Sequence, residues 1–144
     1  MVAICISRTE VNCPSIVALQ HCEQLHLADT GKLYQKVPLH FFSKLTWLNL
    51  NRTPISSKDF PKLVGLAKHL EILNIKSCME TSEQAIFKAK GSLLCLRYIN
   101  ISFNEQFSAL AVACLCSYYS VRDIRARGIK LDRKEALFLT KTFP

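Results

Sequence analysis

Glycine is scarce in this sequence, with four residues of this type among 144. A loop that cradles phosphate needs several glycines close together, and the serine of many hydrolases lies in a Gly-x-Ser-x-Gly turn. Neither pattern occurs here. The four histidines form no His-Glu-x-x-His pair of the kind that holds a catalytic zinc ion on a helix. We therefore expect a protein that is not an enzyme and that uses no cofactor.

Long hydrophobic runs are also missing. The longest run, Ala109 to Cys116, is far shorter than the roughly 20 residues that a membrane-spanning helix requires. The apolar start, Met1 to Ile6, is followed too soon by Arg8 and Glu10 to be a secretory signal. The sequence thus predicts an intracellular protein, cytoplasmic or nuclear, that does not contact a membrane.

Cysteine is plentiful, with seven residues, but the pairs that hold metal are missing. No Cys-x-x-Cys pair occurs, and Cys114-x-Cys116 alone is not a zinc motif. The count is odd, and several cysteines fall at apolar positions of the pattern described below. A buried free thiol behaves as a small hydrophobic group and suits a reducing compartment. We expect free cysteines in the core and no bound metal.

The formal net charge is +8, which raises nucleic acid or an acidic protein as a partner. Most lysines are scattered singly. One basic cluster stands out near the end of the chain: Arg122, Arg125, Arg127, Lys130, Arg133 and Lys134. No aromatic residues interleave with its arginines, and no known nucleic-acid motif surrounds them. A solvated surface is the favoured interpretation, and nucleic acid is an unlikely partner.

One pattern recurs along the chain every 21 to 26 residues. In its clearest copy, Leu48-Asn49-Leu50 alternates as a half-buried strand does, and Thr53 and Ile55 follow. Six copies have their first core position at Ile4, Leu25, Leu48, Leu73, Ile99 and Ile124. Such a period indicates an array of repeats.

Two further positions of the pattern allow a family to be named. An apolar residue lies three positions before most strands, at Cys22, Leu45, Leu70, Leu96 and Val121. A Thr, Cys or Asn lies beyond the strand, at Thr9, Thr30, Thr53, Cys78 and Asn104. Nearly the whole chain thus resembles the leucine-rich repeat L-x-x-L-x-L-x-x-(N/C/T)-x-(L/I), in its ribonuclease-inhibitor-like, cysteine-containing subclass.

This resemblance implies an α/β leucine-rich-repeat solenoid, with short parallel strands on its concave face and helices on its convex face. It implies one domain over residues 1–144 with about six repeats. In the family, the Thr, Cys or Asn side chain bonds backbone groups as the chain leaves the strand. The start of the chain lies inside a strand and offers no cap, so we expect either an array that is shortened at its N-terminus or a first strand that is exposed.

The segments between strands predict helices. Ser57 to Lys68 places Phe60, Leu63, Val64 and Ala67 on one face. A second helix begins at Thr81 or Ser82, buries Ala85, Ile86 and Ala89, and stops at Gly91. Phe107 to Tyr118 has a stripe of Leu110, Ala111, Cys114, Leu115 and Tyr118. A final helix, Asp132 to Thr142, starts at the N-cap Asp132 and turns Ala136, Leu137 and Leu139 toward the last repeat. Weaker candidates are residues 14–21 and 37–43.

In such a fold, the residues between the core positions form columns across strands about 4.8 Å apart. The first column is Gln24, Trp47, Ile72, Tyr98 and Asp123, and the second is Cys5, His26, Asn49, Asn74, Asn100 and Arg125. The third is Ser7, Ala28, Asn51, Lys76, Ser102 and Arg127. From these we select the candidate partner-binding residues Trp47, Asn49, Ile72, Asn74, Lys76, Tyr98, Asn100, Arg125 and Arg127, because aromatic anchors beside polar groups are typical of interface hot spots. The alternative is that the rings cover the sheet and the asparagines are structural.

By resemblance, the expected function is protein–protein recognition on the concave face, as in the ZYG-11/ZER-1 and F-box leucine-rich substrate receptors of cullin-type ubiquitin ligases. The run with Leu110, Cys114 and Tyr118 is similar to the elongin-binding box of such receptors, which leaves a cullin-ligase adaptor open as a partner. Any core-facing helix gives the same spacing, and core packing is the favoured interpretation. Two alternatives remain: a nucleic-acid or phosphate-binding module that uses the C-terminal arginines, and a degenerate fragment without independent activity.

Overall fold

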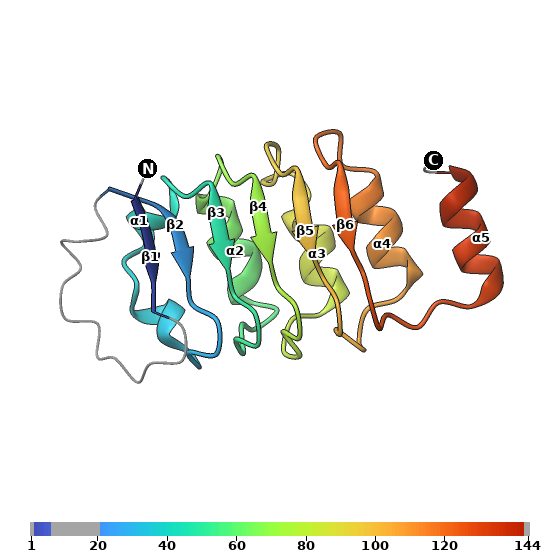
Figure 1. Ribbon diagram of the computed structural model, residues 1–144, viewed down its shortest axis with the longest axis horizontal. Coiled ribbons are helices and arrows are strands. Elements are labelled where there is room, and N and C mark those ends of the chain that lie inside the picture. The colour runs from blue at the N-terminus through green and yellow to red at the C-terminus, as the bar shows by residue number, and fades with distance from the viewer. Residues whose placement is uncertain (1, 7–20, 143–144) are drawn as a thin grey trace.

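The computed structural model of the protein describes residues 2–6 and 21–142. Its six strands form one open sheet in which every neighbouring pair is parallel and the spatial order follows the chain (Figure 1). The strands are β1 (Val2–Cys5), β2 (Cys22–His26), β3 (Trp47–Asn49), β4 (Ile72–Asn74), β5 (Tyr98–Asn100) and β6 (Asp123–Arg125). Parallel neighbours need a crossover segment between them, and here that segment usually carries a helix.

The helices lie on one side of this sheet. They are the 3₁₀ turn η2 (Leu33–Lys36), then α1 (Leu39–Phe42), α2 (Asp59–Leu66), α3 (Glu83–Ala89), α4 (Ala109–Cys116) and α5 (Arg133–Thr142). In Figure 1, α1 to α4 run behind the strands, and α5 follows β6 at the C-terminal end beside α4. The result is a mixed α/β fold of alternating strands and helices. No helix of the described residues is both long and apolar enough to cross a membrane.

The core lies between the sheet and the helices. Successive residues of a strand point to opposite faces, so one set of each strand turns toward the helices. That set is almost fully buried in the inner strands, at Leu25, Leu27, Leu48, Leu50, Leu73, Ile75, Ile99 and Ile101. In β6 the equivalent residues, Ile124 and Ala126, are only partly buried. The predicted core positions of the inner strands are thus confirmed, and the packing thins at both edge strands, since Ile4 and Ile6 of the first repeat are also only partly buried.

Each of the strands β2 to β6 is followed by a turn with a left-handed residue. Positive φ angles of 54° to 73° occur at Asp29, Arg52, Ser77, Phe103 and Gly128, which occupy the same place in successive repeats. This conformation costs a residue with a Cβ atom about 1–2 kcal/mol, and it costs glycine much less. Sequence reasoning missed this column, because glycine marks it only in the last repeat.

The side chain that follows the turn bonds the backbone of neighbouring strands. Thr53 Oγ1 donates to Leu27 O at 2.9 Å, and Cys78 Sγ donates to Leu50 O at 3.0 Å. Asn104 Nδ2 donates to Ile75 O at 2.9 Å. Each of these bonds reaches the preceding repeat, whereas Thr30 Oγ1 bonds Leu27 O within its own repeat at 2.6 Å. The backbone bonding implied by the resemblance is confirmed at these positions, and Thr9 lies outside the described residues.

The predicted helices occur, but two of their faces differ from the prediction. In α3, Ala85, Ile86 and Ala89 are buried as expected, and α2 buries Phe60, Leu63 and Val64. In α4, Leu110 is 65% exposed, and Val112 is buried instead. Nearly every residue of Ala109–Cys116 is apolar, so hydrophobicity alone does not mark a buried face.

Helix α5 begins as predicted and packs differently. Asp132 and Glu135 each accept a hydrogen bond from the other's backbone N–H, at 2.7 and 2.8 Å, which is a capping box. Leu139 is buried, but Leu137 is 54% exposed, because the main helix contact of α5 is with α4. The weaker candidate at 37–43 is confirmed by α1. The candidate at 14–21 lies outside the described residues except for His21.

Candidate functional site

The side of the sheet that α1 to α4 leave uncovered carries the three predicted columns, and we call it the open face. Strand pairing aligns Gln24, Trp47, Ile72, Tyr98 and Asp123 in the first row. The second row is Cys5, His26, Asn49, Asn74, Asn100 and Arg125. The third follows the strand ends, at Ala28, Asn51, Lys76, Ser102 and Arg127, while Ser7 lies outside the described residues. The predicted register is therefore confirmed.

The asparagines of the second row are partly structural. The Oδ1 atoms of Asn49, Asn74 and Asn100 each accept the backbone N–H two residues later, at 3.0 to 3.1 Å. These bonds hold the end of each strand and use one of the two acceptor sites of each oxygen. Asn49 Nδ2 lies 3.4 Å from His26 Nδ1, whereas the Nδ2 atoms of Asn74 and Asn100 have no acceptor in the described part of the chain. Asn74 and Asn100 thus present N–H donors on the open face.

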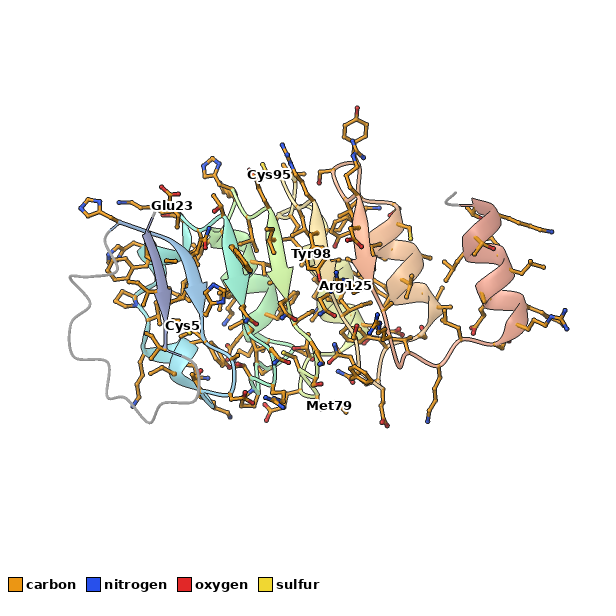
Figure 2. The ribbon with its side chains drawn as sticks, viewed as in Figure 1. Cys5, Glu23, Met79, Cys95, Tyr98 and Arg125 are labelled. Atoms are coloured by element: carbon orange, nitrogen blue, oxygen red, sulfur yellow. The ribbon has the colours of Figure 1, made fainter. Side chains whose placement is uncertain are left out.

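Aromatic rings and cations are interleaved across the open face. The guanidinium carbon of Arg125 lies 5.5 Å from the centre of the Tyr98 ring, as Figure 2 shows for the two labelled side chains. Lys76 Nζ lies 5.1 Å from the centre of the Phe103 ring. Both distances suit a cation–π contact. No aromatic residue lies among the arginines in the sequence, but the sheet brings Tyr98 next to Arg125, because residues in the same place of successive repeats become neighbours.

Phe103 is a surface residue that sequence reasoning missed. It occupies the left-handed turn position, and its ring lies over Gly128 of the next repeat. A Cβ atom on Gly128 would come within 2.8 Å of Phe103 Cδ1. Extending the predicted columns by one residue beyond Ser102 would have found it, as an aromatic side chain where other repeats carry Arg52 and Ser77.

No ion pair of the described residues involves the cations of the open face. The ion pairs found in the described residues, Arg52 with Asp29 and Arg97 with Glu71, use none of Lys76, Arg125 and Arg127. Asp123 is the one carboxylate in the described rows, and it forms no ion pair there. Desolvation by burial lowers the pKa of His26, so its imidazole is neutral near pH 7. The open face is accordingly positive toward β6.

The basic cluster of the sequence is divided in space. Arg122 donates a hydrogen bond to Tyr119 O at 3.2 Å and lines a hollow with Arg97 and Cys95, at the edge where the strands begin. Arg133 and Lys134 belong to α5. Arg125 and Arg127 lie together on the open face, because alternation along a strand turns every second residue to the same side. A single phosphate site made by the whole cluster is therefore not supported.

The remaining polar features of the described residues include no metal site. No three of their His, Cys, Asp and Glu side chains are grouped to hold a metal ion. A second hollow at the strand-start edge mixes opposite charges, with Glu23, Lys44, His69 and Glu71 among its lining residues. Cys78 is buried, and desolvation raises the pKa of its thiol to about 12, which leaves almost no thiolate for chemistry.

Comparison with known proteins adds no identity. No protein-family model matches the chain, and neither does any curated protein.

Proposed function

We propose that the chain is a leucine-rich-repeat solenoid that recognises another protein through the open face. Three features support the family assignment. They are the strand period of 21 to 26 residues, the parallel sheet in chain order, and the backbone bonding by Thr53, Cys78 and Asn104. Leucine-rich repeats combine such a period with one strand and one helical segment in each unit.

The aromatic and aliphatic row of the open face carries the functional part of the proposal. Trp47, Ile72 and Tyr98 are paired neighbours on three adjacent strands, and all three are only partly buried. A contiguous apolar strip on a surface, with polar groups beside it, is typical of protein interfaces, where large rings supply most of the binding energy. The donors of Asn74 and Asn100 flank this strip.

The test is quantitative affinity capture from cell extract with the double variant Trp47→Ala/Tyr98→Ala. We expect specific partners of the wild type to be lost, while circular dichroism stays unchanged. The matched control is Tyr119→Ala/Phe138→Ala, which removes two exposed rings that do not belong to the open face. Retention of every partner by the Trp47/Tyr98 variant would contradict the proposal.

The narrower role of a cullin-ligase substrate receptor is supported by the family resemblance and by one structural detail. Leu110, the first residue of the sequence similar to the elongin-binding box, is exposed on α4 and is not a core residue. We expect Leu110→Ser to lose cullin-ligase subunits from the captured set while it keeps the partners of the open face. Absence of such subunits from the wild-type sample would refute the ligase role and leave the recognition surface untouched.

Nucleic acid is the second candidate, because Arg125 and Lys76 lie over aromatic rings. Basic side chains mixed with rings occur on single-stranded nucleic-acid-binding surfaces. Oligouridine binding, which is included in the experiment below, tests this candidate directly.

A further inference from the structure

The open face carries three cations, Lys76, Arg125 and Arg127, in its second and third rows. Their positions indicate the chemistry of the partner. We propose that the open face binds an extended acidic protein segment, whose carboxylates contact Lys76, Arg125 and Arg127 while its apolar side chains cover the Trp47–Ile72–Tyr98 row. This inference rests on the proposed recognition function and adds the charge and conformation of what is recognised.

Two of the cations are held in place before any partner arrives. Tyr98 lies under Arg125 and Phe103 lies under Lys76, at 5.5 and 5.1 Å. Phe103 is itself supported by Gly128, whose missing side chain makes room for the ring. A long basic side chain normally loses rotamer freedom on binding, and prior ordering reduces that cost.

The same cations lack internal compensation. No carboxylate of the described residues forms an ion pair with Lys76, Arg125 or Arg127, and neutral His26 adds no positive charge on the β2 side. Asp123, in the first row, is the single opposing charge of the described rows. A partner with negative charge toward β4–β6 therefore complements the face, and a basic partner is disfavoured.

The rows also define how the segment lies. Apolar contacts come from the first row, donors from Asn74 and Asn100 in the second, and cations from the second and third rows. Lys76 follows β4 and Arg127 follows β6, two strand spacings away, or about 10 Å. That separation matches about three residues of an extended chain. The segment thus runs across the strands, with apolar side chains on one side and carboxylates on the other.

An acidic peptide fits this face better than single-stranded nucleic acid does. Bases bind by stacking on free ring faces, and cations already lie over the rings of Tyr98 and Phe103. The third large ring, Trp47, has the His26 ring against it at 5.0 Å between ring centres. Three cations also fall short of the roughly 6–10 phosphate contacts that give strong binding to nucleic acid.

The experiment uses fluorescence anisotropy of the full chain with three labelled probes. They are a short glutamate-rich peptide with a central leucine, the same peptide with glutamine in place of glutamate, and oligouridine of equal length. We expect the acidic peptide to bind, the glutamine peptide to bind at least about tenfold more weakly, and the difference to shrink between about 50 and 200 mM salt. Equal binding of the two peptides, or tighter binding of oligouridine, would overturn the inference.

Matched variants locate the effect. Lys76→Gln/Arg125→Gln/Arg127→Gln should weaken binding of the acidic peptide at least about tenfold. Lys88→Gln/Lys134→Gln/Lys141→Gln removes the same charge from α3 and α5 and should leave binding unchanged. Equal loss in both triple variants would show a nonspecific charge effect and sink the proposal.

The two proposals fail separately. If Trp47→Ala/Tyr98→Ala loses its captured partners but the acidic peptide does not bind, only the acidic chemistry is wrong. If this variant keeps every partner, the recognition function itself is wrong.

Discussion

At the scale of single residues, the side chain of Asn104 links the ends of β4 and β5, in addition to the backbone hydrogen bonds of the sheet. The residue is fully buried, and its Nδ2 donates both to Ile75 O at 2.9 Å and to Ile101 O at 2.8 Å. These carbonyls follow β4 and β5. Because buried carbonyls without a donor are costly, the side chain matters more than its small area suggests.

Asn104→Ala should therefore lower the free energy of unfolding by about 2–4 kcal/mol, measured by urea denaturation, since two buried acceptors lose their donor. Asn104→Cys should cost less, because Cys78 makes the equivalent bond to Leu50 O in the preceding repeat. A loss below about 0.5 kcal/mol in the alanine variant would show that water or relaxation satisfies the carbonyls.

Cysteine reactivity provides a second test at the same scale. Cys5 and Cys95 are exposed, whereas Cys22 and Cys78 are buried. Desolvation raises the pKa of Cys78 to about 12, so its thiolate is scarce at pH 8, and burial blocks the reagent as well. We expect iodoacetamide to label Cys5 and Cys95 in the native protein, and Cys22 and Cys78 only in denaturant, as followed by mass spectrometry. Native labelling of Cys78 as fast as Cys95 would contradict the core placement.

At the scale of elements, the left-handed turn after each strand controls what lies on the open face. Gly128 has a φ of 73°, and the Phe103 ring covers it. Gly128→Ala adds both backbone strain and a clash, so we expect a loss of about 1–2 kcal/mol in unfolding free energy and weaker binding of the acidic peptide. The peptide readout follows because Phe103 would have to move from under Lys76.

Alanine substitutions at two other glycines distinguish the effect of backbone strain from that of the clash with Phe103. Gly31 has a φ of 58° but nothing within 4 Å of an added Cβ, so Gly31→Ala reports strain alone. Gly91 has neither feature, and Gly91→Ala should be neutral or slightly stabilising. If all three variants lose the same unfolding free energy and bind the acidic peptide equally, the position of the Phe103 ring does not depend on Gly128.

The elements also show where sequence reasoning succeeds. The two-residue alternation and the repeat period together determine which residues become neighbours, and so the rows through Trp47 and Asn74 were predictable. Helix faces were predictable where polar residues interrupt them, as in α3, and not in α4, where Leu110 and Val112 look alike. Contacts such as that of Lys76 with Phe103 depend on turn geometry and side-chain rotamers, and the spacing of the repeats does not predict either of these.

At the scale of the whole molecule, each strand contacts only the strands before and after it in the chain. Burial of the core positions is nearly complete at Leu48, Leu73 and Ile99, and partial at Ile124. In arrays with contacts of this kind, stability is close to a sum of each unit and its interfaces with neighbours. Within the described residues, the edge strands β1 and β6 each have a neighbouring strand on one side only, so the unit of β6 should open before that of the inner strand β4.

Two substitutions measure this gradient. Leu73→Ala, between two packed neighbours, should cost about 2–5 kcal/mol through the cavity it leaves. Ile124→Ala removes a partly buried side chain and should cost clearly less. Urea unfolding followed by circular dichroism gives both values, and amide hydrogen exchange should show faster exchange in β6 than in β4. Equal losses of unfolding free energy and uniform exchange would mean that the units unfold as one.

An uncooperative unfolding transition of the wild type would instead favour a degenerate fragment, because a packed array loses its structure over a narrow range of denaturant.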